Sequence, residues 1–114
     1  MKIYLAIPYS GIEEESFAVA NKITAHLMYQ GHVVFSPISQ NHMIAKEHGL
    51  PTSWEYWAPF DESFIEWCDC LMIVVMNNNG EERIEKSIGV NDEIRLANEN
   101  DKIIDFIRES DLNC

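Results

Sequence analysis

The chain has 114 residues, of which 46% are hydrophobic and 24% are charged. These are globular proportions, and the length predicts one domain, residues 1–114, with a single modest core. Eight Lys and Arg residues against 19 Asp and Glu residues give a formal net charge of −11. This excess argues against binding to nucleic acid or an anionic membrane, because both need a basic face. It does not exclude a small anionic ligand, which a few local donors can hold.

The apolar and cysteine content sets the expected environment. The longest apolar run, Cys70 to Met76, is far shorter than the roughly 20 residues of a membrane span. The apolar start of the chain runs into Pro8, which is typical of a strand rather than a signal peptide. Cys68, Cys70 and Cys114 form a poor disulfide framework and indicate a reducing compartment, so we expect a cytoplasmic protein. Neither Cys nor His has zinc-site spacing, and we expect no structural metal.

The first two predicted elements are a strand and a helix. Lys2 to Ile7 is short and apolar, as buried strands are. Ser10 stands three residues before Glu13, the spacing of a capping box. Apolar residues then recur at helical spacing to about Gln30, and Gly31 is placed to end the helix.

The middle of the chain repeats this alternation. A second short strand is predicted at His32 to Phe35, broken by Ser36 and Pro37, and a short helix at Asn41 to His48. From Ser53 the pattern is helical again, and Pro59 either lies inside one helix or starts a second one.

The last third begins with the clearest buried strand, Cys70 to Met76. Asn77 to Lys86 is predicted to be a loop, Ser87 to Glu99 a helix, and Ile103 to Ile107 a final strand. The alternation predicts a three-layer α/β sandwich around a mostly parallel, Rossmann-like (flavodoxin-like) sheet of four to five strands.

A ligand crevice is expected beyond the carboxyl ends of parallel strands. This rule selects three segments of the sequence: Pro8 to Gly11, Ser36 to His42 and Asn77 to Gly89. Any polar group that contacts a ligand is therefore expected in or near them.

Two acidic residues stand out on the predicted helices. On one continuous helix, Asp61 falls within an apolar stripe, where an unpaired carboxyl group has a raised pKa and can donate a proton near neutrality. If Pro59 restarts the helix, Asp61 is only a first-turn partner of the helix dipole. Glu93 has Gly89 and Ala97 four residues away on either side, which leaves room for a small ligand. The other interpretation is an ordinary solvated helix residue.

Several further residues are candidates for ligand contact, each with a structural alternative. Ser87 and Gly89 stand where backbone N–H groups bind anions, although Ser87 is also a helix cap. The others are aromatic or polar groups that core packing, capping or local hydrogen bonding would also explain: Tyr4, Tyr9, Ser10, Ser39, His42 and Trp57. Trp57 is a candidate for stacking on a planar base.

Taken together, these segments resemble the nucleoside 2-deoxyribosyltransferase superfamily. The similarity begins with KIYLAIPYSG, continues through GHVVFSPIS-QNH and FDESFIEWCDCLMIVVM, and ends with SIGVNDEIRLA. It covers nearly the whole chain. The WAPFD segment and the length are closest to a small bacterial and phage branch of the superfamily, which is also similar to deoxynucleoside 5′-monophosphate N-glycosidases.

The resemblance implies roles for individual residues. Glu93 matches the nucleophile that attacks C1′ of the sugar, Asp61 the aspartate that protonates or orients the leaving base, and Tyr4 a tyrosine that hydrogen-bonds the nucleophile. Ser87 matches a serine that contacts phosphate in the nucleotide hydrolases, where the transferases have aspartate. The first loop lacks the arginine of those hydrolases, so both substrates stay open.

The resemblance therefore implies cleavage or transfer at the N-glycosidic bond of a (deoxy)nucleoside or its 5′-monophosphate. It implies no cofactor, and it implies a homo-oligomer, a dimer or larger. The alternative is a non-catalytic nucleotide-binding or sensing module on the same fold, since Ser87 and the missing arginine depart from the two enzyme patterns.

Overall fold

A computed structural model describes residues 1–113, and Cys114 lies outside the described residues. Within them the elements follow the order β1 (Lys2–Ala6), α1 (Glu13–Tyr29), β2 (Val33–Phe35), α2 (Pro37–His48), α3 (Trp54–Trp67), β3 (Cys70–Val75), α4 (Gly80–Lys86), α5 (Ile88–Glu99), β4 (Ile103–Arg108) and the 3₁₀ turn η1 (Glu109–Asn113). The four strands form one all-parallel sheet in the order β2-β1-β3-β4. This confirms the predicted Rossmann-like α/β fold, and the order is that of flavodoxin-like sheets.

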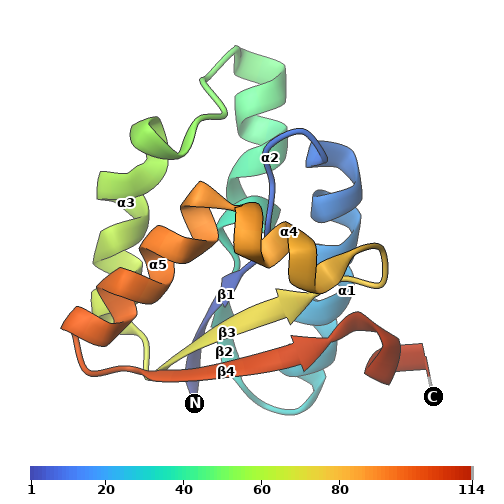
Figure 1. Cartoon of the computed structure of the whole chain (residues 1–114), viewed down its shortest axis with the longest axis vertical. Helices are drawn as coiled ribbons and strands as arrows, with labels where there is room; N and C mark the ends of the chain where they lie inside the picture. The colour runs from blue at the N-terminus through green and yellow to red at the C-terminus, as the bar shows by residue number, and fades with distance from the viewer. Residues whose placement is uncertain (114) are drawn as a thin grey trace.

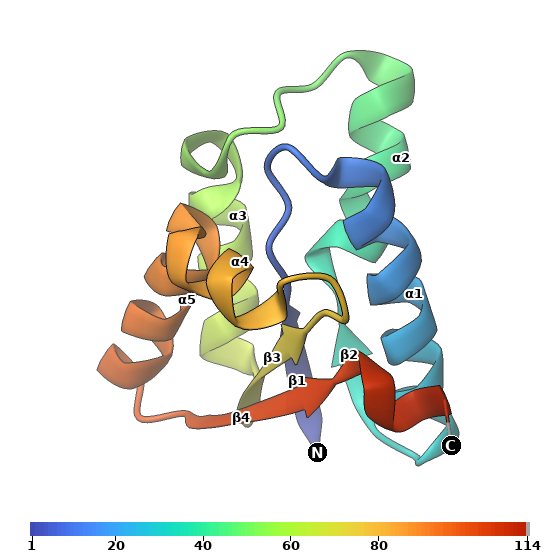
Figure 2. The same ribbon diagram turned by 45° about the vertical axis from the view of Figure 1, so that its right-hand side comes forward.

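Helices cover both faces of the sheet. Figure 2 shows α1 and α2 on one side and α3 and α5 on the other. Successive side chains of a strand point to opposite faces, so β1 contributes to both layers. Within the part of the chain that the structure describes, no helix is long and apolar enough to cross a bilayer.

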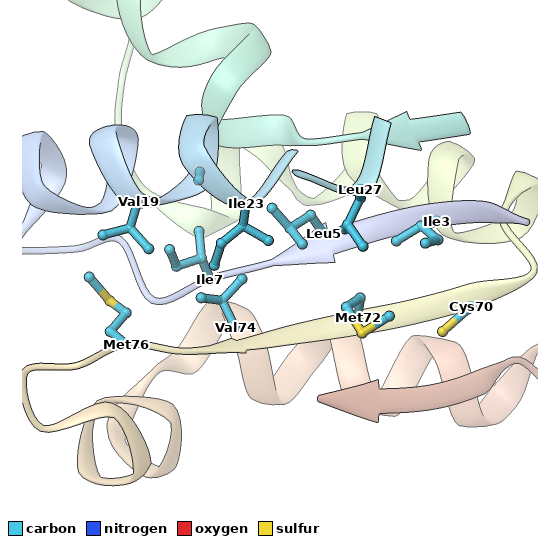
Figure 3. Close-up of a cluster of buried hydrophobic side chains, with 11 residues drawn as sticks. Ile3, Leu5, Ile7, Val19, Ile23, Leu27, Cys70, Met72, Val74 and Met76 are labelled. Carbon is cyan, nitrogen blue, oxygen red and sulfur yellow. The ribbon is translucent and has the colours of Figure 1, made fainter. Parts of the chain in front are cut away.

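The first core lies between the sheet and α1. Ile3, Leu5 and Ile7 pack here against β3 and one face of α1, as Figure 3 shows. The other buried side chains in this layer come from α1, from β3 and from the residue after β3: Val19, Ala20, Ile23, Leu27, Cys70, Met72, Val74 and Met76. Their burial anchors α1, whose first turn lies beside the loop after β1.

The second core lies between the sheet, α3 and α5. Tyr4 and Ala6, the alternate residues of β1, face this side. They pack with buried side chains of α3, of the residue that ends α3, of β3 and of α5: Ile65, Cys68, Leu71, Ile73, Val90, Leu96 and Ala97. Tyr4 is fully buried, so its hydroxyl group lies inside the α3–α5 layer.

Two helix starts differ from the sequence prediction. Ser10 is exposed and does not cap α1, which begins after Ile12 without a side-chain cap. The reason is the turn after β1, in which the Ile12 amide donates to the Tyr9 carbonyl and carries Ser10 away from the helix. α2 begins at Pro37 rather than Asn41, because Pro37 occupies the first helical position and Ser36 caps it by accepting from the Ser39 amide.

Pro59 lies inside α3, which is one continuous helix. Aromatic contacts run along the helix past the proline: Phe60 contacts Trp57, with ring centroids 5.8 Å apart, and Phe64, with centroids 5.3 Å apart. Aromatic side chains on both sides of the proline, which cannot donate a backbone hydrogen bond, therefore contact one another along the helix. Of the two placements considered for Asp61, the structure has the one on a continuous helix.

The predicted loop from Asn77 to Lys86 contains a short helix, α4. Gly80 begins it in close contact with β3, where a Cβ atom would stand 2.7 Å from Val75 Cγ1. Arg83 then pairs with Glu15 of α1 at 2.7 Å. These tertiary contacts hold a seven-residue helix that local propensity alone would not stabilise.

Candidate active site

A cavity of about 570 Å³ opens at the carboxyl ends of the strands. All three segments selected from the sequence contribute to its lining, in the loop after β1, the start of α2 and the stretch from Asn79 to Gly89. The order of the sheet reverses between β1 and β3, and crevices in parallel sheets lie at such points. The remaining wall comes from α3 and α5, including Asp61 and Glu93.

Glu93 lines the cavity from α5 yet is only 5% exposed. The Tyr4 hydroxyl donates a hydrogen bond to Glu93 Oε2. Burial raises the pKa of Glu93 well above its usual range, the bond from Tyr4 opposes the rise, and the charges of Asp61 and Asp92 add to it. The solvated-helix interpretation of Glu93 is wrong, because this face of α5 packs on the sheet.

Asp61 approaches from α3 and is 4% exposed. Among the residues that the structure describes, none forms a hydrogen bond with its buried Oδ1 atom. Burial raises the pKa of Asp61 to about 7, and the Tyr4 hydroxyl opposes this rise. A buried carboxyl oxygen without a protein partner, at the edge of a cavity, is free to meet a ligand.

Tyr4 connects the two carboxyl groups. Burial raises the pKa of its hydroxyl, and the negative charges of Glu93 and Asp61 raise it further. Tyr4 therefore keeps its proton and remains a donor. A donor favours the ionised form of the group that accepts from it, so the Tyr4 hydroxyl opposes the rise in the pKa of both carboxyl groups.

The opposite wall comes from α2 and the loop after β1. The Tyr9 hydroxyl lies 2.6 Å from His42 Nδ1, and His42 Nε2 lies 2.7 Å from Glu14 Oε2. Glu14 also pairs with Lys46 at 2.6 Å. Both Tyr9 and His42 line the cavity, whereas neither Glu14 nor Lys46 stood out in the sequence.

The other predicted contact residues divide into two groups. Ser10, Trp57, Ser87 and Gly89 line the cavity, and Ser87 also caps α5 by accepting from the Val90 amide at 3.1 Å. Ser39 is not among the described residues that line it. Its backbone amide and hydroxyl both bond to the Ser36 hydroxyl, in the first turn of α2.

Two cations at the cavity were missed by sequence reasoning. Arg83 and Lys86 both line it from α4, in the segment predicted to be a loop. A signal was present, since Glu82 and Lys86 stand four residues apart and pair at 2.6 Å. The Arg83 side chain is 17% exposed and is held by Glu15, whereas the Lys86 side chain is 74% exposed.

Trp54, the first residue of α3, also lines the cavity. Its Nε1 atom donates to Asp92 at 2.7 Å, and its ring lies over Gly89. Across residues 1–113, no group of three or more His, Cys, Asp or Glu side chains is placed to hold a metal ion.

The chain belongs to the family described as "Domain of unknown function (DUF1937)", whose model matches residues 1–108. Among solved structures it is similar to a 2-deoxyribosyltransferase from the psychrotolerant bacterium Bacillus psychrosaccharolyticus, with a TM-score of 0.59 and 27% sequence identity. That match covers 95% of this chain and 72% of the other. No curated protein matches the sequence.

Proposed function

We propose that this DUF1937 protein cleaves the N-glycosidic bond of a nucleoside or nucleoside 5′-monophosphate, with Glu93 as nucleophile and Asp61 as general acid. One observation carries the proposal: two buried carboxyl groups from different helices meet around one tyrosine hydroxyl at one cavity. The similarity to a 2-deoxyribosyltransferase supports the same chemistry.

In the first step, the Glu93 carboxylate attacks C1′ of the sugar. A C–O ester bond forms, the bond from C1′ to the base nitrogen breaks, and Asp61 donates its proton to the departing base. Charge builds up on the sugar in an oxocarbenium-like transition state, which a carboxylate beneath the ring stabilises. The pKa of Asp61 near 7 suits this proton transfer.

In the second step, an acceptor attacks C1′ and the ester to Glu93 breaks. Water as acceptor gives hydrolysis and a free sugar, whereas a second base gives a new nucleoside. In either case the Asp61 carboxylate takes up the proton that the acceptor loses, which restores both residues.

The sugar end of the substrate is either a 5′-hydroxyl or a 5′-phosphate. Ser87 presents a hydroxyl rather than a carboxylate at the start of α5, and Arg83 and Lys86 also line the cavity. These groups favour a 5′-phosphate, which the sequence alone did not favour over a 5′-hydroxyl. The acidic Glu82, which also lines the cavity and pairs with Lys86, favours a neutral sugar.

A second candidate is a binding module that retains the cavity without turnover. The raised pKa of Glu93 favours it, because a protonated carboxyl group is a poor nucleophile. In the enzyme, the Tyr4 bond must outweigh burial once substrate is bound.

Incubation with deoxynucleosides and their 5′-monophosphates, followed by chromatography, tests the proposal. We expect free base from at least one substrate, and loss of the product with Glu93→Ala. Glu99→Ala, an exposed glutamate at the far end of the same helix, is the matched control and should keep full activity. Binding measured by calorimetry without base release would favour the module, and the absence of binding would contradict both.

A further inference from the structure

We infer that Tyr9 is a hydrogen-bond acceptor for a donor group of the ligand, held in that role by His42 and Glu14. For the identity of the ligand, the inference rests on the proposed function. A nucleoside offers two kinds of donor, a sugar hydroxyl and an N–H of the base, and both would be recognised by the same lone pair.

The three side chains form a continuous chain from the cavity to the surface. Tyr9 follows β1 and is half-buried, His42 is 5% exposed on α2, and the Glu14 side chain is 66% exposed on α1. The Phe17 ring stacks on the imidazole, with centroids 4.4 Å apart and an interplanar angle of 28°. The imidazole is therefore fixed both by its hydrogen bonds and by packing.

The positions of the protons in this series of hydrogen bonds follow from its exposed end, at Glu14. Hydrogen bonds from Lys46 and His42 lower the pKa of Glu14, so its carboxylate is ionised and only accepts. His42 Nε2 must then carry the hydrogen that Glu14 accepts. A neutral imidazole has one N–H and one lone pair, which leaves the lone pair on Nδ1.

The inner end follows in turn. With its lone pair on Nδ1, His42 accepts the Tyr9 O–H proton across 2.6 Å. Burial and the charges of Glu13 and Glu14 raise the pKa of Tyr9, so its proton is retained. The oxygen of Tyr9, a residue that lines the cavity, then has only lone pairs to offer a ligand.

This assignment separates two residues that the sequence grouped together. Both ring nitrogens of His42 are already engaged within the protein, so His42 is a positioning residue and Tyr9 is the ligand contact. Glu14 and Lys46 act only through them.

The tautomer can be tested without a ligand. We expect ¹⁵N NMR at pH 8 to show His42 protonated at Nε2 and not at Nδ1. The spectrum of His42→Gln assigns the signal among the four histidines. A proton on Nδ1, in either the other neutral tautomer or the imidazolium, would overturn the inference.

The ligand contact is tested by calorimetry in a Glu93→Gln background, which blocks turnover. Tyr9→Phe should weaken deoxyadenosine binding by about 2- to 10-fold, the size of one hydrogen bond. Three analogues identify the donor: 2′,3′-dideoxyadenosine lacks the 3′-hydroxyl, 2′,5′-dideoxyadenosine lacks the 5′-hydroxyl, and a purine deoxynucleoside without the exocyclic amino group lacks the base donor. One of them should bind Tyr9→Phe and the Tyr9 protein equally well.

Glu14→Gln tests the remote end, because a glutamine amide can donate to Nε2 and so permits the other tautomer. We expect it to lose part of the Tyr9-dependent affinity, while Glu47→Gln, at an exposed glutamate of α2, loses none. If Tyr9→Phe weakens deoxyadenosine and its three analogues equally, or weakens none of them, the inference is overturned while the proposed function stands. If no nucleoside binds, the proposed function fails and takes this inference with it.

Discussion

On one side of the cavity, α3 and α5 bring two carboxyl groups together with one tyrosine hydroxyl between them. On the other side, side chains of α1, α2 and the loop after β1 form a series of hydrogen bonds from Tyr9 to Lys46, in which every side chain has a protein partner. Both walls bury polar side chains, but only the first buries acids without a cation among the hydrogen-bonded partners of the described residues.

The difference separates chemistry from recognition. Burial of acids without cationic partners lowers the stability of the fold and raises the pKa of the carboxyl groups. A carboxyl group that is still protonated near neutral pH is then available as a proton donor. A series of hydrogen bonds in which every group is paired fixes which atom donates each hydrogen, and it presents one defined contact to a ligand. The experiments below change one wall at a time.

The largest effect is expected when the acid is removed. Asp61→Asn should lower kcat by about 10²- to 10⁴-fold, since the leaving base then departs without a proton. The loss should be much smaller with an N7-methylated purine nucleoside, whose base already carries a positive charge. Equal losses with both substrates would contradict the assignment of Asp61 as general acid.

The same substitution should also stabilise the fold, in a pH-dependent way. The pKa of Asp61 is about 7 in the folded protein, whereas an ordinary Asp side chain, as in the unfolded chain, has a pKa of 3.8. Between these two pH values the unfolded chain therefore binds fewer protons than the folded protein. Stability therefore falls as pH rises through this window and is level above it. We expect Asp61→Asn to gain up to about 4 kcal/mol at pH 8 and little below pH 4.

Urea unfolding at both pH values measures this gain. Asp101→Asn, at an exposed aspartate in the turn after α5, is the control and should not respond to pH in this way. A gain that is the same at both pH values would show that burial does not raise the pKa of Asp61.

Tyr4→Phe is expected to act through Glu93. Loss of the donor raises the pKa of Glu93 further, so the acid limb of the pH–rate profile should move to higher pH. The unfolding free energy should fall by about 1–3 kcal/mol, because a buried carboxyl group loses its partner. Tyr56→Phe, at a tyrosine that is 47% exposed, should change neither quantity.

The alternation of strands and helices was predictable because it is local. Apolar runs, turn residues and the Ser87 cap all appear within a few residues of each other. Whether Glu93 was solvated or buried was not local, since it depends on which face of α5 packs on the sheet. The placement of Asp61 likewise depended on whether α3 continued through Pro59.

The opposite wall was predictable only in part. Tyr9 and His42 lie in segments that the strand-end rule selects, but their partner Glu14 comes from the first turn of α1, where the helix dipole alone explains an acid. The α4 cations were hidden because Gly80 and its contact with Val75 determine that helix. A contact between segments that are distant in the sequence produces no periodic pattern in the sequence.

A smaller effect is expected at the start of α5. Ser87→Ala removes the hydroxyl that accepts from the Val90 amide and should destabilise the protein by about 1 kcal/mol. Ser53 offers a matched control, because it precedes α3 in an extended conformation but makes no side-chain cap. Ser53→Ala should therefore unfold at nearly the same urea concentration as the unmodified protein.

The smallest effect is expected from substitution of Lys86, which tests whether the substrate carries a 5′-hydroxyl or a 5′-phosphate. Its side chain is largely exposed and already paired with Glu82, so its attraction for a phosphate is weakened by solvent and by that pair. In the Glu93→Gln background, Lys86→Gln should weaken binding of a deoxynucleoside 5′-monophosphate about two- to three-fold and leave the deoxynucleoside unaffected. Added salt should reduce this difference, since it screens exposed charges. Lys22→Gln, at an α1 lysine outside the described cavity lining, is the control, and an equal effect on both ligands would exclude Lys86 from phosphate binding.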